Sequence, residues 1–261
     1  MYKIVPIKAL TDSYIWLIIN RHGNCVIVDP GEAEQVMDYI KQEQLKPVAI
    51  LITHHHYDHI NGIAAINKEY KLPVFGGKNS TFGFVELYLR ENDSIELSQF
   101  EAAFTAIETP GHTSDHISYH FEGSLFCGDT IFSAGCGRFP KEKAEQMLTS
   151  IEKIKQLPHE TRIYCAHEYT LDNLEFAEHI EPDNGEISRY KTICMDNRKR
   201  GLPTLPSTLK QELQINPFLR CSQQAVIDSV SEKSGVAPAN SADVLRELRK
   251  LKDNFKNNLC L

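Results

Sequence analysis

Strand-like apolar runs in this chain repeatedly end at a histidine or an aspartate, and no other feature limits the fold as much. The run "VAILIT" at 48–53 leads into "HHHYDH" at 54–59. Three further runs end in the same way, at His112 after "FTAIETPG", at Asp129 after "SLFCG" and at His167 after "RIYCA". Strands packed in one core bring their ends to one edge, where the sites of α/β proteins usually lie. We therefore expect an α/β fold that gathers these side chains at one edge.

The spacing inside the histidine-rich segment offers two pairs of metal ligands from one loop. In an extended chain, His54 and His56 point to one side and His55 points to the other. Asp58 and His59 then follow on a turn. His55 is therefore expected to point away from a bound ion and to pack or hydrogen-bond among the neighbouring strands.

The candidate ligands are too numerous for one ion. They are His54, His56, Asp58, His59, His112, Asp129 and His167. A catalytic zinc usually takes three protein ligands and a water, so this set suits two ions that share one carboxylate. Its nitrogen and oxygen donors suit Zn, Fe or Mn. Two such ions can hold a hydroxide between them at neutral pH and stabilise an oxyanion, which predicts hydrolysis of an acyl or phosphoryl bond.

The remaining histidines and two further carboxylates are expected to be structural or surface residues. They are His22, His120, His159, His179, Asp29 and Glu108.

Composition excludes several classes of protein. The chain has 261 residues, of which 41% are hydrophobic, enough for one large domain or one large and one small domain. A net charge of -7 excludes a broadly basic surface for nucleic acid or an anionic membrane. No apolar run approaches the roughly 18 residues of a transmembrane helix, and the N-terminal run does not resemble a signal peptide. The seven cysteines form no CxxC pair, so we expect reduced thiols in a cytoplasmic protein.

The character of the chain changes near residue 172. Before this point, strand-like runs alternate with short amphipathic helices. After it, three helical patterns are joined by the proline-rich segment 201–220. We predict a catalytic α/β domain over residues 1–172 and a smaller helical, substrate-binding domain over residues 173–261.

The motifs "THHHYDH", "PGHTSDH", "GDT" and "CAHEYT" resemble the ligand motifs of the metallo-β-lactamase superfamily. This resemblance implies a four-layer αββα sandwich. "GCGRF" at 135–139, "PSTL" at 206–209, "NPFLR" at 216–220 and "RKLKDNF" at 249–255 are similar to the glyoxalase II family, hydroxyacylglutathione hydrolases. That family hydrolyses S-D-lactoylglutathione to D-lactate and glutathione in methylglyoxal detoxification. The resemblance covers nearly the whole chain, and the helical C-terminal domain is itself a feature of the family.

The resemblance also implies a role for each candidate. The first metal would be held by His54, His56, His112 and a bridging Asp129, and the second by Asp58, His59, His167 and the same Asp129. Glutathione would be held by Arg138, Phe139, Tyr169, Arg249 and Lys252. The hydroxide between the ions, oriented by Asp58, would attack the thioester carbonyl without a separate general base. Zinc is the expected metal, and the glutathione thioester is the expected partner of a monomeric enzyme.

Two residues depart from the family pattern. Asp115 stands where the family usually has glycine, and it could bond to a ligand histidine or face water; we expect it to face solvent. Pro140 stands where the family usually has an aromatic residue, so a substrate contact from that side chain is in doubt. His116 is expected to support the site or to be structural, because the seven ligand positions are filled without it.

Three alternatives stay open at this point. Another dinuclear hydrolase of this superfamily is the first, but a phosphodiesterase or RNA-processing enzyme is disfavoured by the net charge and by the glutathione motifs. An iron-dependent persulfide dioxygenase uses fewer metal ligands than this chain offers. A binding module without activity would not need an open dinuclear site.

Overall fold

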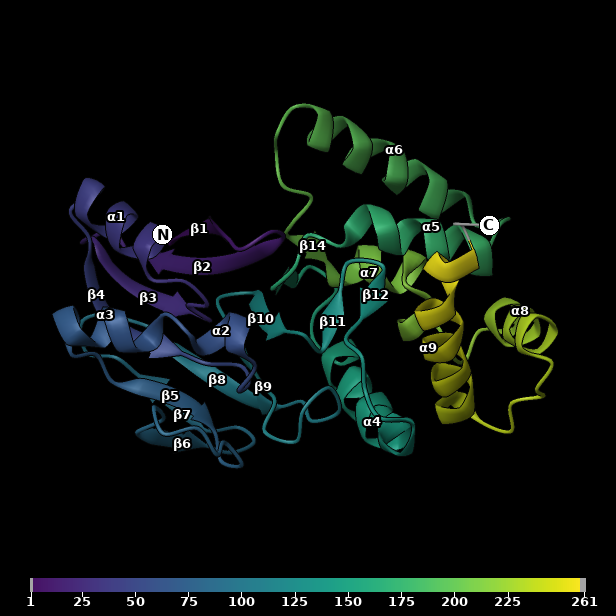
Figure 1. The fold of residues 1–261 in the computed structure, drawn as a ribbon, viewed down its shortest axis with the longest axis horizontal. Coiled ribbons are helices and arrows are strands. Elements are labelled where there is room, and N and C mark those ends of the chain that lie inside the picture. The colour runs from purple at the N-terminus through teal and green to yellow at the C-terminus, as the bar shows by residue number, and fades with distance from the viewer. Residues whose placement is uncertain (1, 259–261) are drawn as a thin grey trace.

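Two six-stranded sheets lie face to face in the N-terminal part of the chain (Figure 1). The structure is a computed structural model, and it describes residues 2–258. The first sheet has the strand order β1-β2-β3-β4-β5-β6. Its strands are β1 Lys3–Ala9, β2 Ser13–Ile19, β3 Asn24–Val28, β4 Lys46–Leu51, β5 Val74–Gly77 and β6 Leu87–Leu89. β1 to β3 are antiparallel, whereas β3 to β6 run parallel.

The second sheet has the order β14-β13-β10-β9-β8-β7. Its strands are β7 Ser94–Glu96, β8 Ala103–Glu108, β9 Ile117–Phe121, β10 Ser124–Gly128, β13 Arg162–Cys165 and β14 Ser207–Thr208. β10 and β13 are parallel neighbours. A separate short hairpin pairs β11 Ile131–Phe132 with β12 Gly135–Cys136. β14 follows the first two C-terminal helices, so the helical part of the chain contributes a strand to the second sheet.

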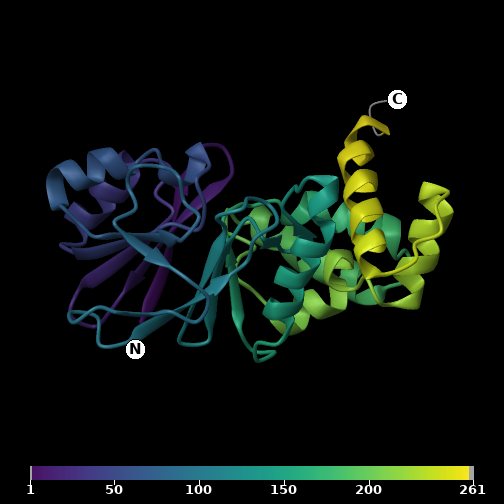
Figure 2. The same cartoon turned by 90° about the horizontal axis from the view of Figure 1, so that it is seen from below.

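Helices α1 to α3 lie beside the first sheet, and the C-terminal helices gather at one end of the sandwich (Figure 2). The helices are α1 Glu34–Gln42, α2 Tyr57–Ile60, α3 Ile63–Tyr70, α4 Ala144–Lys155, α5 Thr170–Ile180, α6 Gly185–Lys199, α7 Leu209–Ile215, α8 Gln224–Ser234 and α9 Ser241–Asn258, with 3₁₀ turns at Lys141–Lys143 and Pro217–Leu219. α9 packs against α4 and α8. Among the described residues, none of these helices combines the length and apolar character that a membrane crossing requires.

Alternation along β2 explains the layers. Tyr14, Trp16 and Ile18 belong to the core between the two sheets, whereas Ile15 and Leu17 belong to the core beneath α1 and α3. Side chains of a strand alternate between its two faces, so the wholly buried sequence "SYIWLII" supplies both cores at once. Helix α4 adds its own apolar face to the same cluster of buried side chains as the second sheet. The result is the four-layer αββα arrangement with a helical C-terminal region.

The ends of β4, β10 and β13 meet at one edge of the sandwich. The amide of Ala166, just after β13, donates to the carbonyl of Gly128 at the end of β10 at 3.2 Å. Gly128 has a φ of +46°, and a Cβ added there would lie 2.3 Å from Thr53 Oγ1, just after β4. Only glycine allows this close approach of the two strand ends. The segments that begin with His54, Asp129 and His167 therefore start side by side.

Candidate metal centre and adjoining cavity

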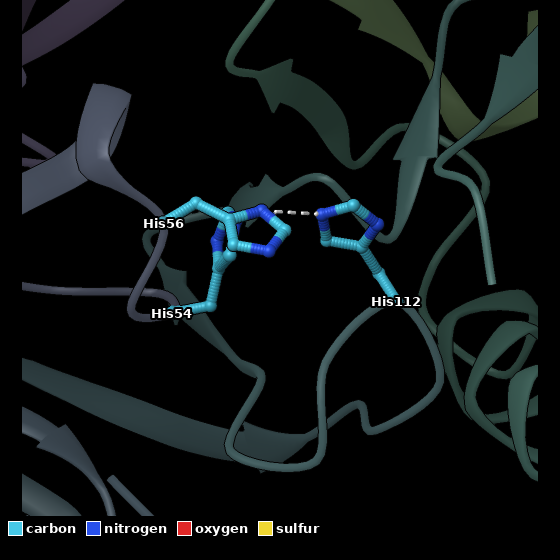
Figure 3. Close-up of side chains that lie close together, drawn as sticks. All are labelled: His54, His56 and His112. Carbon is cyan, nitrogen blue, oxygen red and sulfur yellow. Dashed lines mark hydrogen bonds between the residues drawn. The ribbon is translucent and has the colours of Figure 1, made fainter. Parts of the chain in front are cut away.

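Three histidines converge on one point at this edge. His54 and His56 come from the loop after β4, and His112 comes from the loop between β8 and β9 (Figure 3). One nitrogen from each ring lies within 4.8 Å of the others. His56 Nδ1 and His112 Nε2 are 3.0 Å apart. His54 Nε2 is buried and has no hydrogen-bond partner among the described residues, which is the arrangement expected of a nitrogen that binds a cation.

A second group lies beside the first. Asp58, His59 and His167 also offer ligand atoms within 4.8 Å of one another. Asp58 Oδ2 lies 3.4 Å from His167 Nε2 and 3.7 Å from His59 Nε2. His59 Nε2 is buried without a hydrogen-bond partner in the described part of the chain. These three residues are those that the family resemblance assigns to one ion.

Asp129 lies between the two groups. Its Oδ2 is 3.5 Å from His112 Nε2 of the first group. Its Oδ1 is 3.5 Å from both His59 Nε2 and His167 Nε2 of the second group. Two carboxylate oxygens that face different ligand groups can bridge two ions. The residues present therefore fit two divalent cations that share one carboxylate, and the structure brings all seven candidate ligands together.

The histidines of the second group are held by carboxylates. His59 Nδ1 donates to Asp29 Oδ2 at 2.9 Å, and His167 Nδ1 donates to Asp12 Oδ1 at 3.0 Å. Because an ionised carboxylate only accepts, Nδ1 carries the proton and Nε2 faces the ion position. Our expectation that Asp29 is merely structural missed this role. The signal was present in the sequence, because "CVIVD" also ends an apolar strand with an aspartate.

The histidines of the first group have neutral partners instead. His112 Nδ1 donates to the carbonyl oxygen of Arg138 at 2.6 Å. The hydroxyl of Thr53 donates to Asp29 Oδ2 at 2.7 Å, so its oxygen accepts from His54 Nδ1 at 3.1 Å. The two ligand groups therefore differ in charge as well as in composition. The first has three histidines, two of them with neutral supports, and the second has a carboxylate ligand and two carboxylate-backed histidines.

Burial and neighbouring charges set the protonation of the ligands. Burial, together with the nearby histidines, holds the pKa of His54 well below its usual value, so this ring is a neutral ligand. Burial also disfavours the cationic form of His167, but the carboxylates of Asp129 and Asp58 outweigh it and raise the pKa to about 11. Burial opposes the charge of Asp129, yet His59 and His167 outweigh it and lower that carboxyl's pKa. Without bound cations, the positive charge of His167 is therefore balanced by the carboxylates of Asp58 and Asp129.

Residues 115 and 116 have different roles from each other. His116 is buried, and its Nε2 accepts from the backbone amide of Asp129 at 3.1 Å. It supports a ligand without being one, in agreement with our interpretation. Our expectation for Asp115 was wrong, because its side chain is only 1% exposed and accepts a hydrogen bond from His55 Nδ1 at 2.7 Å. The tight backbone approach of Gly77 holds Asp115 inward, since a Cβ there would lie 2.2 Å from the Asp115 carbonyl oxygen.

A cavity of about 480 Å³ opens from the metal centre toward the helical domain. His112 and Asp129 line its inner end, and its other lining residues include Arg138, Tyr169, Asp172, Arg249, Lys252 and Asp253. Phe139 does not line this cavity; its side chain is buried in the core. A hollow of about 600 Å³ lies elsewhere in the helical domain, but none of the candidate ligands lines it. Of these two hollows, the cavity at the metal centre is therefore the one relevant to chemistry.

The cationic side chains around this cavity are anchored differently. Arg249 is buried, and it donates to the Cys136 carbonyl at 3.1 Å and to Asp253 at 2.9 Å. Lys252 Nζ donates to the carbonyl of Asp172 at 2.7 Å. The Arg138 side chain is 82% exposed and lies 3.3 Å from Asp253.

Tyr169 completes the wall on the metal side. Its ring stacks on His167 with centroids 4.8 Å apart and planes 2° from parallel. Burial, together with the nearby charge of Asp12, raises the pKa of its hydroxyl, so the hydroxyl stays protonated and can donate.

The fold and the site define a hydrolase of the metallo-β-lactamase superfamily. Residues 10–167 match the family model of that superfamily, and residues 168–255 match the model described as the hydroxyacylglutathione hydrolase C-terminus. The chain belongs to the hydroxyacylglutathione hydrolase family, also called glyoxalase II.

Relatives and solved structures agree with this assignment. The chain is 40% identical to the hydroxyacylglutathione hydrolase of Nitrosomonas europaea, over 99% of this chain and 98% of that protein. It is 43% identical to that of Photobacterium profundum, over 98% of this chain and all of that protein. The fold is similar to BLEG-1 B3 metallo-β-lactamase, with a TM-score of 0.63 and 25% identity over 84% of this chain and 99% of that one. ETHE1 from Myxococcus xanthus shares the fold, with a TM-score of 0.65 and 23% identity over 93% of this chain and 98% of that one.

Proposed function

We propose that this enzyme hydrolyses the thioester S-D-lactoylglutathione to D-lactate and glutathione, as part of methylglyoxal detoxification. One observation carries the proposal: a single cavity joins the ligands of two ions to a set of cationic side chains from α9. The ions would lie where a thioester carbonyl must react, and the cations lie where the carboxylates of glutathione need partners. The relatives named hydroxyacylglutathione hydrolase match over the full chain, which supports the same substrate.

The roles of this chain's residues at the metal centre follow from their geometry. His54, His56 and His112 would hold one ion, Asp58, His59 and His167 the other, and Asp129 both. When bound, two divalent ions supply an activated water at neutral pH and a Lewis acid for the carbonyl oxygen. Asp58 and Asp129 would be the catalytic carboxylates: the two oxygens of Asp129 face different ligand groups, and Asp58 Oδ2 lies 3.4 Å from His167 Nε2 in the second group. Zinc suits this donor set best, with iron or manganese as substitutes.

The substrate-binding residues would act on the glutathionyl part. Arg249 and Lys252 present positive charge toward the cavity and can pair with a carboxylate. Arg138 has the most exposed head group of the three cations and can follow a mobile carboxylate. The Tyr169 hydroxyl can donate to a peptide carbonyl. Phe139 would contribute through its backbone or through packing, because its side chain is buried.

A thiol-release assay tests the proposal on zinc-loaded protein. S-D-lactoylglutathione should be hydrolysed, and a lactoyl thioester of a small thiol without the glutathione peptide should be turned over far less efficiently. A phosphodiester runs beside them to test the other dinuclear chemistry. Full metal content with no release of glutathione would contradict the proposal.

One competing function shares this fold. A persulfide dioxygenase would consume oxygen with glutathione persulfide and an iron-loaded protein. The complete second ligand group, Asp58, His59 and His167, favours the hydrolase. Oxygen uptake by the iron-loaded protein, without thioester hydrolysis, would reverse this preference.

We further propose how the enzyme is organised and where it works. The division into a catalytic domain over residues 1–172 and a substrate-binding domain over residues 173–261 follows the change from strands to helices near α5. The six cysteines in the described residues are buried free thiols, which supports a reducing, cytoplasmic location. The partner would be the small-molecule thioester, with no nucleic acid or membrane, and the enzyme would act as a monomer. Light scattering coupled to gel filtration tests the last point.

A further inference from the structure

Residues 53–59 form the loop that carries four of the candidate ligands, here called the metal loop. One histidine of this loop, His55, forms a hydrogen bond with a carboxylate instead of facing an ion position. His55 Nδ1 donates to Asp115 Oδ1 at 2.7 Å, and the carboxylate is almost completely buried. The hydroxyl of Ser80 donates to the other oxygen, Oδ2, at 3.3 Å. The His55 side chain, in contrast, is 42% exposed. The His55–Asp115 pair is therefore a short hydrogen bond with a fixed, buried end and a more accessible end.

The pair joins the two loops that carry the first ligand group. His55 stands between His54 and His56 in the chain, and Asp115 follows His112 by three residues. The distance between His54 or His56 and His112 is therefore set, in part, by the bond between their neighbours. The bond spans 60 residues of sequence and lies outside the ion positions themselves.

The Asp115 end of the pair is anchored to the first sheet. The backbone of Gly77, at the end of β5, lies so close to the Asp115 carbonyl that a side chain there would collide with it. Asn79 Nδ2 donates to the neighbouring carbonyl of Ser114 at 3.2 Å. The loop that carries His112 is thus fixed to β5 on one side and to the metal loop through His55 on the other.

The bond should be strong for physical reasons. A carboxylate acceptor forms shorter and stronger hydrogen bonds than a neutral one, and burial strengthens the attraction further. Loss of His55 would leave a buried carboxylate oxygen without this donor, which is costly. The first ligand group also needs such support more than the second, because the partners behind His54 and His112, the Thr53 hydroxyl and the Arg138 carbonyl, are neutral.

We propose that the His55–Asp115 pair is a positioning pair that holds the two loops at the spacing required by the first ion, and so sets the affinity of that site. This inference rests on the proposed two-ion centre but not on its substrate. It predicts that loss of the pair weakens the first ion and leaves the second ion nearly unchanged.

A double-mutant cycle tests the pair. Zinc affinity is measured by chelator competition for the wild type, Asp115→Ala, His55→Ala and the double variant. Two zinc-binding steps are expected, one for each ligand group. The step that is lost or weakened in His112→Ala is the step that belongs to the first group. We expect each single variant to weaken that step about 10-fold, as is usual for residues that orient metal ligands. The double variant should also lose about 10-fold, because both substitutions remove the same bond.

Two further variants separate positioning from general damage. His55→Asn keeps a donor near the Nδ1 position and should recover most of the affinity that His55→Ala loses. Ser80→Ala removes only the longer bond to Asp115 and should change affinity less than threefold. Hydrogen exchange of the metal-free protein should rise in residues 53–59 and 109–116 in the Asp115→Ala variant, with little change in α5 or α9.

Several results would overturn the inference. Losses that multiply to about 100-fold in the double variant would show that the two residues act independently. Equal weakening of both binding steps, or failure of His55→Asn to recover affinity, would show a general packing role. These measurements use no substrate, so a protein that binds two ions normally but cleaves no thioester would contradict the proposed function and leave the pair intact.

Discussion

At the scale of single residues, the carboxylates behind the ligands matter as much as the ligands. Asp29 accepts from the Thr53 amide and hydroxyl, each at 2.7 Å, and from His59 Nδ1 at 2.9 Å. One buried side chain therefore fixes the start of the metal loop and the orientation of a ligand near its end. Such residues keep the ligand's free nitrogen aimed at the ion.

We predict that Asp29→Ala weakens metal binding about 10- to 100-fold, because His59 loses the acceptor that fixes its ring. Chelator competition with zinc measures this change. Asp38→Ala is the matched control, since that carboxylate is exposed on α1 and should leave affinity unchanged. Equal affinities for wild type and Asp29→Ala would contradict the role assigned to Asp29.

Arg249 and Lys252 provide a second prediction at this scale. Either substitution by alanine should raise KM about 10- to 100-fold with a smaller effect on kcat, because each removes a charged partner of the bound substrate. Arg249→Ala should also lower the free energy of unfolding, by about 1–3 kcal/mol, since it leaves the Cys136 carbonyl without a donor at a buried position, whereas the bond from Lys252 to the Asp172 carbonyl is exposed to water. Steady-state kinetics and denaturant unfolding measure the two effects. A collapse of kcat at unchanged KM would mean that Arg249 has been given the wrong role.

At the scale of elements, the β11–β12 hairpin links the helical domain to the metal centre. Glu212, which is fully buried in α7, accepts from the Ser133 hydroxyl at 2.9 Å and from the Ala134 amide at 2.8 Å. Beyond β12 the chain reaches Arg138, whose carbonyl fixes His112. The hairpin therefore couples the position of α7 to that of His112, a candidate ligand of the first ion.

The buried carboxyl of Glu212 should make stability depend on pH. Burial raises its pKa, so its folded-state pKa lies above its unfolded-state value. Its contribution to stability is therefore fully present below the unfolded pKa and is lost as pH rises through the folded pKa. Relative to the wild type, Glu212→Gln should become progressively more stable as pH rises from about 4.5, the ordinary value for glutamate.

Thermal unfolding of the metal-free proteins across this pH range measures the difference in Tm. Any loss of hydrogen bonds in Glu212→Gln is independent of pH and cancels in the comparison. Glu175→Gln, at an exposed position of α5, should give a much flatter difference. A constant difference between wild type and Glu212→Gln at all pH values would show that Glu212 does not titrate in this way.

At the scale of the whole molecule, one core serves both domains. The buried cluster that includes the core between the two sheets also contains Phe126 and Ile163 of the second sheet and Val244, Leu245 and Leu248 of α9. Strand β14 adds backbone hydrogen bonds from the C-terminal part to β13. The sequence-based division near residue 172 therefore marks a change in secondary structure, while the apolar packing continues across it.

We predict that the metal-free protein unfolds in a single cooperative transition, because neither domain can keep its apolar surface buried without the other. Calorimetry and circular dichroism should give coincident midpoints, and residues 1–172 alone should not fold to a stable product. Two separated transitions, or a stable catalytic fragment, would show that the domains are energetically independent.

The spacing of residues along the chain was enough to predict the fold class and the set of candidate metal ligands. The order His-x-His-x-Asp-His and the apolar runs that end at His112, Asp129 and His167 indicated the ligand set and the α/β class, because strand geometry fixes which side chains share a side. Tertiary structure alone decided that Asp115 is buried against His55, that Asp12 supports His167, and that Arg249 is buried. Each of these facts depends on contacts between segments tens of residues apart, and no local pattern carries that information.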